Sequence, residues 1–263
     1  MSEAQPWWSP ESDFFGARYL EADDSAHTFF AGSSELGQRT MREVDGLAAL
    51  TGIEPGSRVC DCPCGYGRHS VELAVRGYDV VGVDINPHFL GLAKAATTQA
   101  GAKADFRLAD MRDLPDFGQV DLIINMFYSF GFFDSADDDL RVLKGFRERL
   151  RDDGQVLLHT MVTVPALLDG RIPAEETREL RSGRKLRSVR RFDEATRREV
   201  GHWAILDDGS EDALPRYSMR IYLPDELEQL CQRAGFDSVL TYGDWTGSPY
   251  QPDSPYLIAV ARA

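Results

Sequence analysis

The segment at residues 59–84, VCDCPCGYGRHSVELAVRGYDVVGVD, constrains the fold more than any other part of the chain. It predicts a short buried strand, a turn that contains Gly65 and Gly67, a helix that ends near Gly77, and a second buried strand rich in β-branched residues. A strand, a crossover helix and a second strand in this order form a right-handed parallel unit. The segment therefore predicts an α/β protein.

The same alternation of helices and buried strands continues to about residue 162 and resumes near residue 223. The last two predicted strands, at 236–242 and 256–261, are joined by a loop too short for a helical crossover, so we expect them to pair antiparallel. Between residues 165 and 222, where the alternation of helices and strands stops, we expect two strands of an antiparallel hairpin. The predicted units are an N-terminal lid at 1–39, a Rossmann-like core at 40–164, a small antiparallel β insertion at 165–222, and a helix with a hairpin at 223–263 that completes the sheet.

Aromatic and acidic residues are concentrated at the N-terminus. The first 30 residues contain Trp7, Trp8, Phe14, Phe15, Tyr19, Phe29 and Phe30, and six acids against a single arginine. This mixture predicts either a helical segment that packs onto the rest of the protein or a lid over a binding site. Trp8 and Tyr19 are candidate substrate contacts. In the insertion, residues 178–198 hold many arginines interleaved with acids, which favours a solvated strand face. Contact with a substrate or with a second copy in a homodimer is left open.

Composition restricts the partners. The 29 basic and 43 acidic residues give a net charge of −14, which disfavours nucleic acid because phosphate recognition depends on clustered lysine and arginine. No apolar run approaches the roughly 18–20 residues of a membrane-spanning helix. The cysteines Cys60, Cys62 and Cys64 are too closely spaced for a disulfide framework, which predicts a reduced, cytoplasmic protein. Cys60 is expected in the strand and Cys64 in the turn, so the three cysteines and His69 do not converge on one metal ion, and no metal site is expected.

Acidic residues close the first two predicted strands. Asp84 at the end of the second strand can accept hydrogen bonds from both hydroxyls of a ribose, which predicts a nucleoside-type ligand. The pattern Gly65-x-Gly67-x-x-Ser70 is close to that of dinucleotide-binding loops. Asp61, however, precedes the glycine turn, where a carboxylate is badly placed for a pyrophosphate and well placed for an amino-acid ammonium group.

The pattern Asp61-x-x-Cys64-Gly65-x-Gly67 resembles the first motif of the class I S-adenosylmethionine-dependent methyltransferases. The chain departs from the commonest form of that motif at Pro63, where a glycine is usual. The segment after the fourth strand and the C-terminal hairpin are similar to those of bacterial small-molecule methyltransferases, including glycine and amino-sugar N-methyltransferases. The resemblance covers residues 40–165 and 217–263, and it implies a seven-stranded Rossmann-like sheet with a reversed last strand.

The resemblance also implies roles for individual residues. Asp84 and Ile85 match the ribose-binding acid and its neighbour on the adenine face, and Asp110 and Met111 match the pair at the adenine edge. The residues expected to bind S-adenosylmethionine are Asp61, Cys62, Gly65, Gly67, Asp84, Ile85, Asp110, Met111 and Asn125.

Methyl transfer is an in-line displacement, so positioning supplies much of the rate, and a base helps if the nucleophile begins protonated. Tyr128, after the fourth strand, and His159, near the end of the fifth, are the candidate catalytic residues. The candidate substrate contacts are Trp8, Tyr19, Phe130, His202 and Tyr217.

The expected function is methyl transfer from S-adenosylmethionine to a small molecule, with an amine nucleophile favoured. Three alternatives stay open: a cyclase or lyase that acts on the cofactor itself, a non-catalytic cofactor-binding or assembly protein, and an NAD-dependent oxidoreductase.

Overall fold

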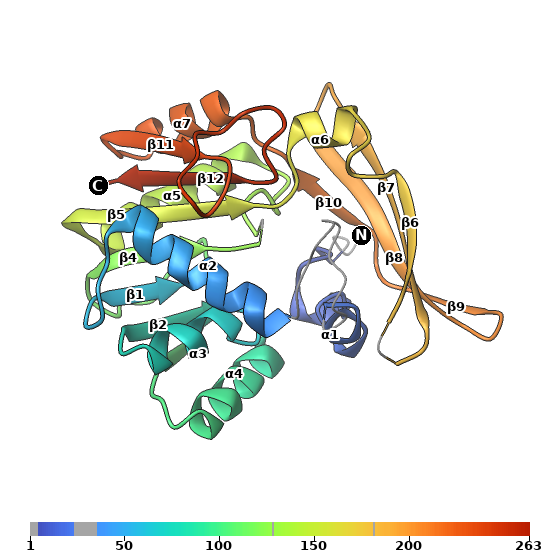
Figure 1. Cartoon of the computed structure of the whole chain (residues 1–263), viewed down its shortest axis with the longest axis horizontal. Helices are drawn as coiled ribbons and strands as arrows, with labels where there is room; N and C mark the ends of the chain where they lie inside the picture. Colours follow the sequence, from blue (N-terminus) through green and yellow to red (C-terminus); the bar gives the residue numbers. More distant parts are fainter. Residues whose placement is uncertain (1–4, 24–35, 128, 181) are drawn as a thin grey trace.

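The computed structural model describes residues 5–23, 36–127, 129–180 and 182–263. Its centre is a seven-stranded sheet in the order β11-β12-β5-β4-β1-β2-β3 (Figure 1). The strands are β1 (Arg58–Asp61), β2 (Asp79–Asp84), β3 (Asp105–Leu108), β4 (Val120–Asn125), β5 (Leu150–Thr160), β11 (Ser238–Tyr242) and β12 (Leu257–Arg262). The first five strands are parallel, and β12 runs antiparallel to both of its neighbours, β5 and β11. The predicted sheet with a reversed last strand is confirmed.

Helices cover both faces of this sheet, because buried residues alternate between the two faces along each strand. On one face lie α2 (Leu36–Thr51), α3 (Arg68–Val75) and α4 (Pro87–Gln99), and on the other lie α5 (Ala136–Arg149) and α7 (Pro224–Arg233). Within β4, Leu122 and Ile124 pack with α2 and α3, whereas Ile123 packs with α5. Parallel strands buried on both sides explain the continuous apolar run that predicted β4.

The chain between the two parts of the central sheet forms α6 (Val164–Leu168) and a separate antiparallel sheet. The strands of that second sheet are β6 (Glu175–Glu179), β7 (Lys185–Asp193), β8 (Arg198–Asp207), β9 (Ser210–Ala213) and β10 (Tyr217–Arg220). Their order is β10-β8-β7-β6, with β9 paired to β8, so the predicted antiparallel insertion is confirmed. One expectation fails here: Arg190, placed on a solvated face, has a buried side chain because alternate residues of β7 point inward.

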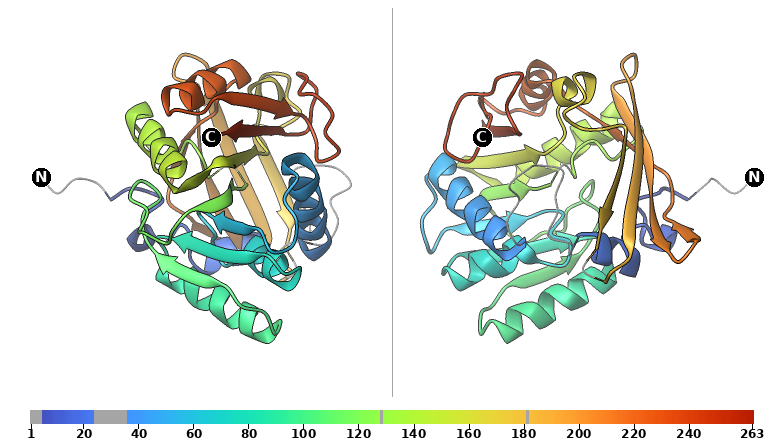
Figure 2. Two further views of the ribbon diagram at one scale, coloured as in Figure 1. Left: turned by 90° about the vertical axis from the view of Figure 1, so that its left-hand side faces the viewer. Right: turned by 45° about the vertical axis from the view of Figure 1, so that its right-hand side comes forward.

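The described N-terminal segment lies between the two sheets (Figures 1 and 2). It contains η1 (Pro10–Ser12) and α1 (Ala17–Asp23), and it is fastened to the second sheet by polar contacts. Trp7 Nε1 donates a hydrogen bond to the Ser218 carbonyl at 3.2 Å, and Arg18 pairs with Asp212 at 2.7 Å. These contacts place the aromatic segment over the carboxyl edge of the central sheet.

Within the described part of the chain the four cysteines are free, and no group of three metal-binding side chains gathers. The same residues contain no helix with the length and apolar character needed to cross a membrane.

Candidate functional site

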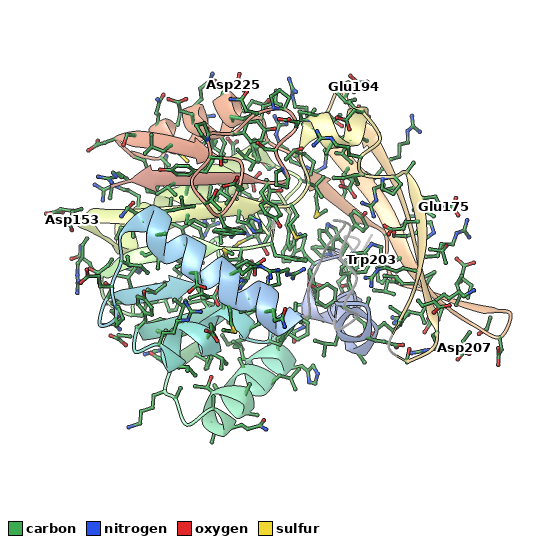
Figure 3. All side chains as sticks on the ribbon, viewed as in Figure 1. Asp153, Glu175, Glu194, Trp203, Asp207 and Asp225 are labelled. Carbon is green, nitrogen blue, oxygen red and sulfur yellow. The ribbon has the colours of Figure 1, made fainter. Side chains whose placement is uncertain are left out.

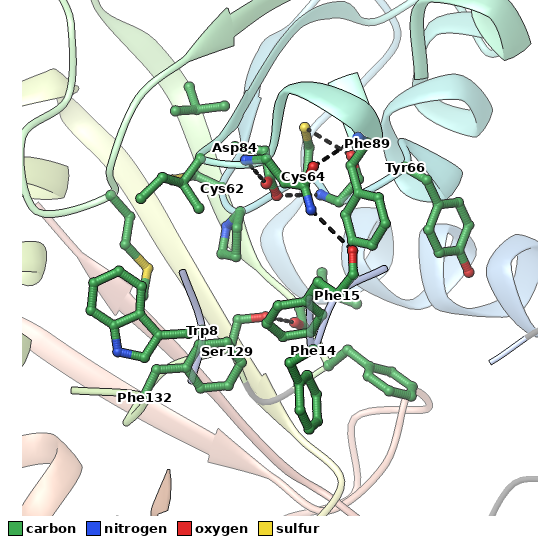
Figure 4. Close-up of a pocket in the computed structure, with 18 of the residues that line it drawn as sticks. Trp8, Phe14, Phe15, Cys62, Cys64, Tyr66, Asp84, Phe89, Ser129 and Phe132 are labelled. Carbon is green, nitrogen blue, oxygen red and sulfur yellow. Dashed lines mark hydrogen bonds between the residues drawn. The ribbon is translucent and has the colours of Figure 1, made fainter. Parts of the chain in front are cut away.

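One cavity opens where the carboxyl ends of the central strands face the N-terminal segment and the second sheet (Figure 4). Its walls combine the turn after β1, the ends of β2 and β3, the loop after β4, and side chains of β8 and β10. The predicted residues that line it are Cys62, Gly65, Asp84, Ile85, Asp110, Met111, Trp8, Tyr19 and Tyr217. The fold therefore brings together both predicted cofactor positions and predicted substrate positions.

The two glycines of the turn have different tasks. Gly65 has a φ of 55°, and a side chain built there would meet no atom within 4 Å, so its backbone faces open space. Gly67 has a φ of 88°, and a Cβ there would lie 2.6 Å from the Cβ of Ala93. Gly65 thus leaves room for a ligand against the backbone, whereas Gly67 permits close packing of α3 on α4 and does not line the cavity.

Asp84 lies at the end of β2 and holds the turn in place. Its carboxylate accepts hydrogen bonds from the Gly65 N–H at 2.7 Å and the Asn86 N–H at 2.8 Å (Figure 4). Burial raises the pKa of Asp84 to about 6, although these amide hydrogen bonds lower it. A carboxylate beside a glycine cradle at the edge of a parallel sheet fits the ribose of a nucleoside ligand.

Two other predicted cofactor positions lie behind the cavity wall. Asp61 is buried, accepts a hydrogen bond from Ser70 Oγ at 2.6 Å, and does not line the cavity. Burial raises its pKa to about 7. Asn125 donates from Nδ2 to the Cys62 carbonyl at 2.9 Å, which orients the wall residue Cys62. Direct contact of Asp61 and Asn125 with the cofactor stays a prediction.

Asp110 marks the polar end of the cavity. The guanidinium group of Arg112 contacts both carboxylate oxygens, the shortest contact being 2.7 Å. The same guanidinium lies 4.5 Å from the ring centre of Phe133 and 5.0 Å from that of Trp8. Trp8 therefore lies at the Asp110 end of the cavity, and its contact with a substrate stays a prediction.

His159, a candidate base, lies outside the cavity. Its Nδ1 accepts a hydrogen bond from the Phe127 N–H at 3.3 Å, and its ring packs against Trp245 and Tyr256. Burial lowers its pKa to about 3. His159 lies near the end of β5 as predicted, but strand alternation turns its side chain toward the α2 face and away from the cavity, so we correct the assignment of His159 as a base. The other candidate, Tyr128, lies outside the described residues.

A histidine at the start of α3 also lines the cavity. His69, in the first turn of α3, shares a hydrogen bond of 2.8 Å between Nε2 and the carboxylate of Glu43. Burial alone would raise the pKa of Glu43, but Arg68, His69 and Arg39 outweigh it and hold that pKa well below its usual value. Burial lowers the pKa of His69 to about 4. This compact charged cluster forms the wall beneath the start of α3.

Aromatic side chains line the rest of the cavity. The rings of Tyr19 and Trp203 stack at 6.0 Å, and Trp7 packs edge-on against Phe132 at 4.7 Å. Figure 3 shows Trp203 on the side of the second sheet that faces the centre of the molecule. These residues come from the N-terminal segment, the loop after β4, and the second sheet, and Phe14 and Phe15 of the N-terminal segment also line the cavity.

Two predicted substrate contacts, His202 and Phe130, lie beside residues of the cavity lining but do not line it themselves. His202 precedes Trp203 in β8 and does not line the cavity, because successive strand residues face opposite sides. Phe130 packs against Tyr222 at 5.4 Å and also lies outside the lining, whereas Phe132 belongs to it. Gly201 lies on the same face of β8 as Trp203, where the absence of a side chain makes room for Tyr217. A glycine two residues before a tryptophan is therefore the sequence signal that marks the cavity-facing side of β8.

The doubly wound sheet with its reversed strand and the glycine–aspartate turn define a nucleoside-binding protein of the methyltransferase type. Residues 59–154 match the family described as "Methyltransferase domain". The chain therefore contains a class I S-adenosylmethionine-dependent methyltransferase domain, as the sequence predicted, and its cofactor is S-adenosylmethionine rather than NAD.

Known proteins are similar over parts of the chain. Magnesium-protoporphyrin O-methyltransferase of Rhodobacter capsulatus is 43% identical over 34% of this chain and 40% of its own length. A glycine/sarcosine/dimethylglycine N-methyltransferase of Actinopolyspora halophila is 28% identical over 78% of this chain and 35% of its own length. The chain thus spans less than half of either relative. CalS10, an amino pentose methyltransferase of Micromonospora echinaspora solved with S-adenosylmethionine bound, superposes with a TM-score of 0.67 at 18% identity, covering 94% of this chain and 95% of its own.

Proposed function

We propose that the protein transfers a methyl group from S-adenosylmethionine to a small molecule, with an amine as the favoured nucleophile. The observation that carries this proposal is that one cavity holds both the Gly65 and Asp84 cradle and an aromatic chamber, which is lined by Trp7, Tyr19, Phe132 and Trp203. When bound, the cofactor supplies a methyl group on a cationic sulfur, and transfer joins the methyl carbon to the nucleophile while the carbon–sulfur bond breaks to leave a neutral thioether.

The residues present fit this cofactor. Gly65 leaves open space beside its backbone, Asp84 offers carboxylate oxygens for ribose hydroxyls, and Ile85, Asp110 and Met111 line the wall next to it. Arg68 also lines the cavity and is a cation suited to a carboxylate group. The protein's part is to bind, to orient, and to exclude water, which is how positioning accelerates a displacement reaction.

The preference for an amine rests on the chemistry of the chamber. Aromatic faces stabilise cations, and a methylated amine develops positive charge as the new bond forms. The rings of Trp7 and Tyr19 from the N-terminal segment and of Trp203 from β8 supply such faces. One similar protein is an N-methyltransferase and another is an O-methyltransferase, so the nucleophile has to be tested directly. A cytoplasmic location and a homodimer stay predictions.

Acceptors in matched pairs, one bearing an amine and the other a hydroxyl on the same carbon skeleton, test the proposal. S-adenosylhomocysteine and the methylated product are measured together by mass spectrometry, and an incubation without acceptor detects cleavage or cyclisation of the cofactor. We expect product from amines ahead of hydroxyl partners. Turnover of hydroxyl compounds alone would refute the amine preference, and breakdown of the cofactor without any acceptor would refute methyl transfer.

A further inference from the structure

A tyrosine of the cavity wall is joined to a buried carboxylate. Tyr217, in β10, lines the cavity, and its hydroxyl donates a hydrogen bond of 2.6 Å to Oε1 of Glu199. Glu199 belongs to the adjacent strand β8 and is fully buried. The phenol therefore stands between the cavity and a carboxylate that solvent does not reach.

Glu199 retains acceptor capacity. Its second oxygen, Oε2, is buried and has no hydrogen-bond partner among the residues that the structure describes. Glu199 pairs with Arg190 of β7, whose Nε lies 3.9 Å from Oε1 and whose side chain is also buried. Burial raises the pKa of Glu199, and the charge of Arg190 and the Tyr217 hydrogen bond offset only part of that effect. A carboxylate in this setting takes up a proton more readily than an exposed one.

The surroundings fix the phenol in place. A Cβ at Gly201 would lie 2.7 Å from the Tyr217 hydroxyl oxygen, so the missing side chain there makes room for it. The rings of Trp7 and Phe14 lie 6.0 Å from the Tyr217 ring on the cavity side. Backbone, sheet register and aromatic packing thus hold Tyr217 at the cavity wall with its hydroxyl on Glu199.

We propose that Tyr217 accepts the proton of the methyl acceptor while it passes its own proton to Glu199. This proposal rests on the proposed methyl transfer. Replacing a bond from nitrogen to hydrogen by one from nitrogen to methyl carbon releases one proton. That proton moves to the Tyr217 oxygen, the Tyr217 proton moves to the Glu199 carboxylate, and Glu199 becomes a neutral acid, so charge and atoms balance. A hydroxyl that donates one hydrogen bond can also accept another, which the relay requires.

The chain offers a matched control outside the cavity. The hydroxyl of Tyr222 donates to the buried carboxylate of Asp139, also at 2.6 Å, and neither residue lines the cavity. Tyr222→Phe therefore removes the same kind of hydrogen bond without changing the lining of the cavity.

The kinetic test measures Tyr217→Phe, Glu199→Gln and the variant that carries both changes, with Tyr222→Phe as the control. Each variant is first checked for folding by thermal unfolding and for S-adenosylhomocysteine binding by calorimetry. Loss of a general base typically lowers kcat by about 10²-fold or more, and we expect this for both single variants with acceptor KM nearly unchanged. Because the two residues act as a unit, the double variant should be no slower than the singles. If Tyr217→Phe does not fold, Glu199→Gln carries the test. A kcat within about threefold of the parent in a folded variant, or multiplicative losses, would overturn the relay.

A second test needs neither cofactor nor turnover. Infrared difference spectra between the parent protein and Glu199→Gln identify the carboxyl band of Glu199, which is then titrated with pH. Tyr217→Phe removes a hydrogen bond that lowers the pKa of Glu199, so the midpoint should rise, whereas Tyr222→Phe should leave it unchanged. An unchanged midpoint in Tyr217→Phe would show that the two groups are not coupled. If this coupling is present but no acceptor is ever methylated, the proposed function fails and the coupling stands.

Discussion

Asp84 allows the sharpest prediction about cofactor binding. Its carboxylate accepts hydrogen bonds from the Gly65 and Asn86 amides and lines the cavity where a ribose fits. In Asp84→Asn, the new NH2 group would face one of these two N–H donors whichever way the amide lies. A ribose hydroxyl that donates a hydrogen bond to this charged carboxylate contributes about 1.5–3 kcal/mol to binding, so loss of one such bond in Asp84→Asn should weaken S-adenosylhomocysteine binding by about 10- to 150-fold.

The pKa of about 6 adds a pH dependence to this binding. Above that pH the carboxylate is ionised and accepts the ribose hydroxyls, and one pH unit below it most molecules carry a proton there. Affinity should therefore fall by about tenfold, or about 1.4 kcal/mol, between pH 7 and pH 5. Asp84→Asn should lose this part of the pH dependence.

Folding stability changes in the opposite direction. The pKa of Asp84 is raised from 3.8 to about 6 in the folded state, so the folded protein binds more protons than the unfolded chain between these values. The unfolding free energy then falls as pH rises through that window, and the ionised carboxylate costs about 3 kcal/mol at pH 7. Asp84→Asn removes this cost, so its Tm should change far less than its affinity.

Calorimetric titration with S-adenosylhomocysteine from pH 8 to pH 5 measures these effects. Asp79→Asn is the matched control, because Asp79 lies at the other end of β2 with an exposed side chain. A dissociation constant for Asp84→Asn within about threefold of the parent at pH 8 would refute the ribose assignment. Retention of the full decline in affinity between pH 7 and pH 5 would refute Asp84 as its source.

Three further outcomes are expected. Gly67→Ala puts a Cβ 2.6 Å from that of Ala93 at a positive φ, so it should lower the unfolding free energy by about 1–3 kcal/mol in denaturant titrations; an unchanged midpoint would contradict the packing argument. Glu43→Gln leaves a cluster of buried cations without its carboxylate and should lower the unfolding free energy by about 3–5 kcal/mol in the same titration. A decrease below about 1 kcal/mol would contradict a stabilising role of the Glu43 carboxylate. Asn86→Asp keeps the cap of α4 but cannot donate to the Phe15 carbonyl, now 3.0 Å away, so hydrogen exchange in the N-terminal segment should accelerate. Unchanged exchange would show that this bond does not hold the segment.

The cofactor half of the site could be predicted from the sequence, because its determinants are local. A glycine turn and an acid at a strand end are adjacent in the chain, and the parallel strand order brings Gly65, Asp84 and Asp110 to one edge without any distant contact. The same local patterns predicted the helices, the central strands and the reversed last strand. Even there, whether Asp61 reaches the cavity or lies behind its wall depends on how one side chain packs against Ser70.

The acceptor half depends on tertiary structure. Trp7 bonds to Ser218, 211 residues later in the chain, and the chamber exists only because the N-terminal segment docks on the second sheet. Strand alternation predicts that His159 and Leu158 face opposite sides, but only helix packing decides which side is the cavity. Likewise, residue type alone places Glu199 and Arg190 in solvent, whereas pairing of β7, β8 and β10 buries both beside Tyr217. Sequence periodicity specifies which residues share a face, and long-range packing determines what that face meets.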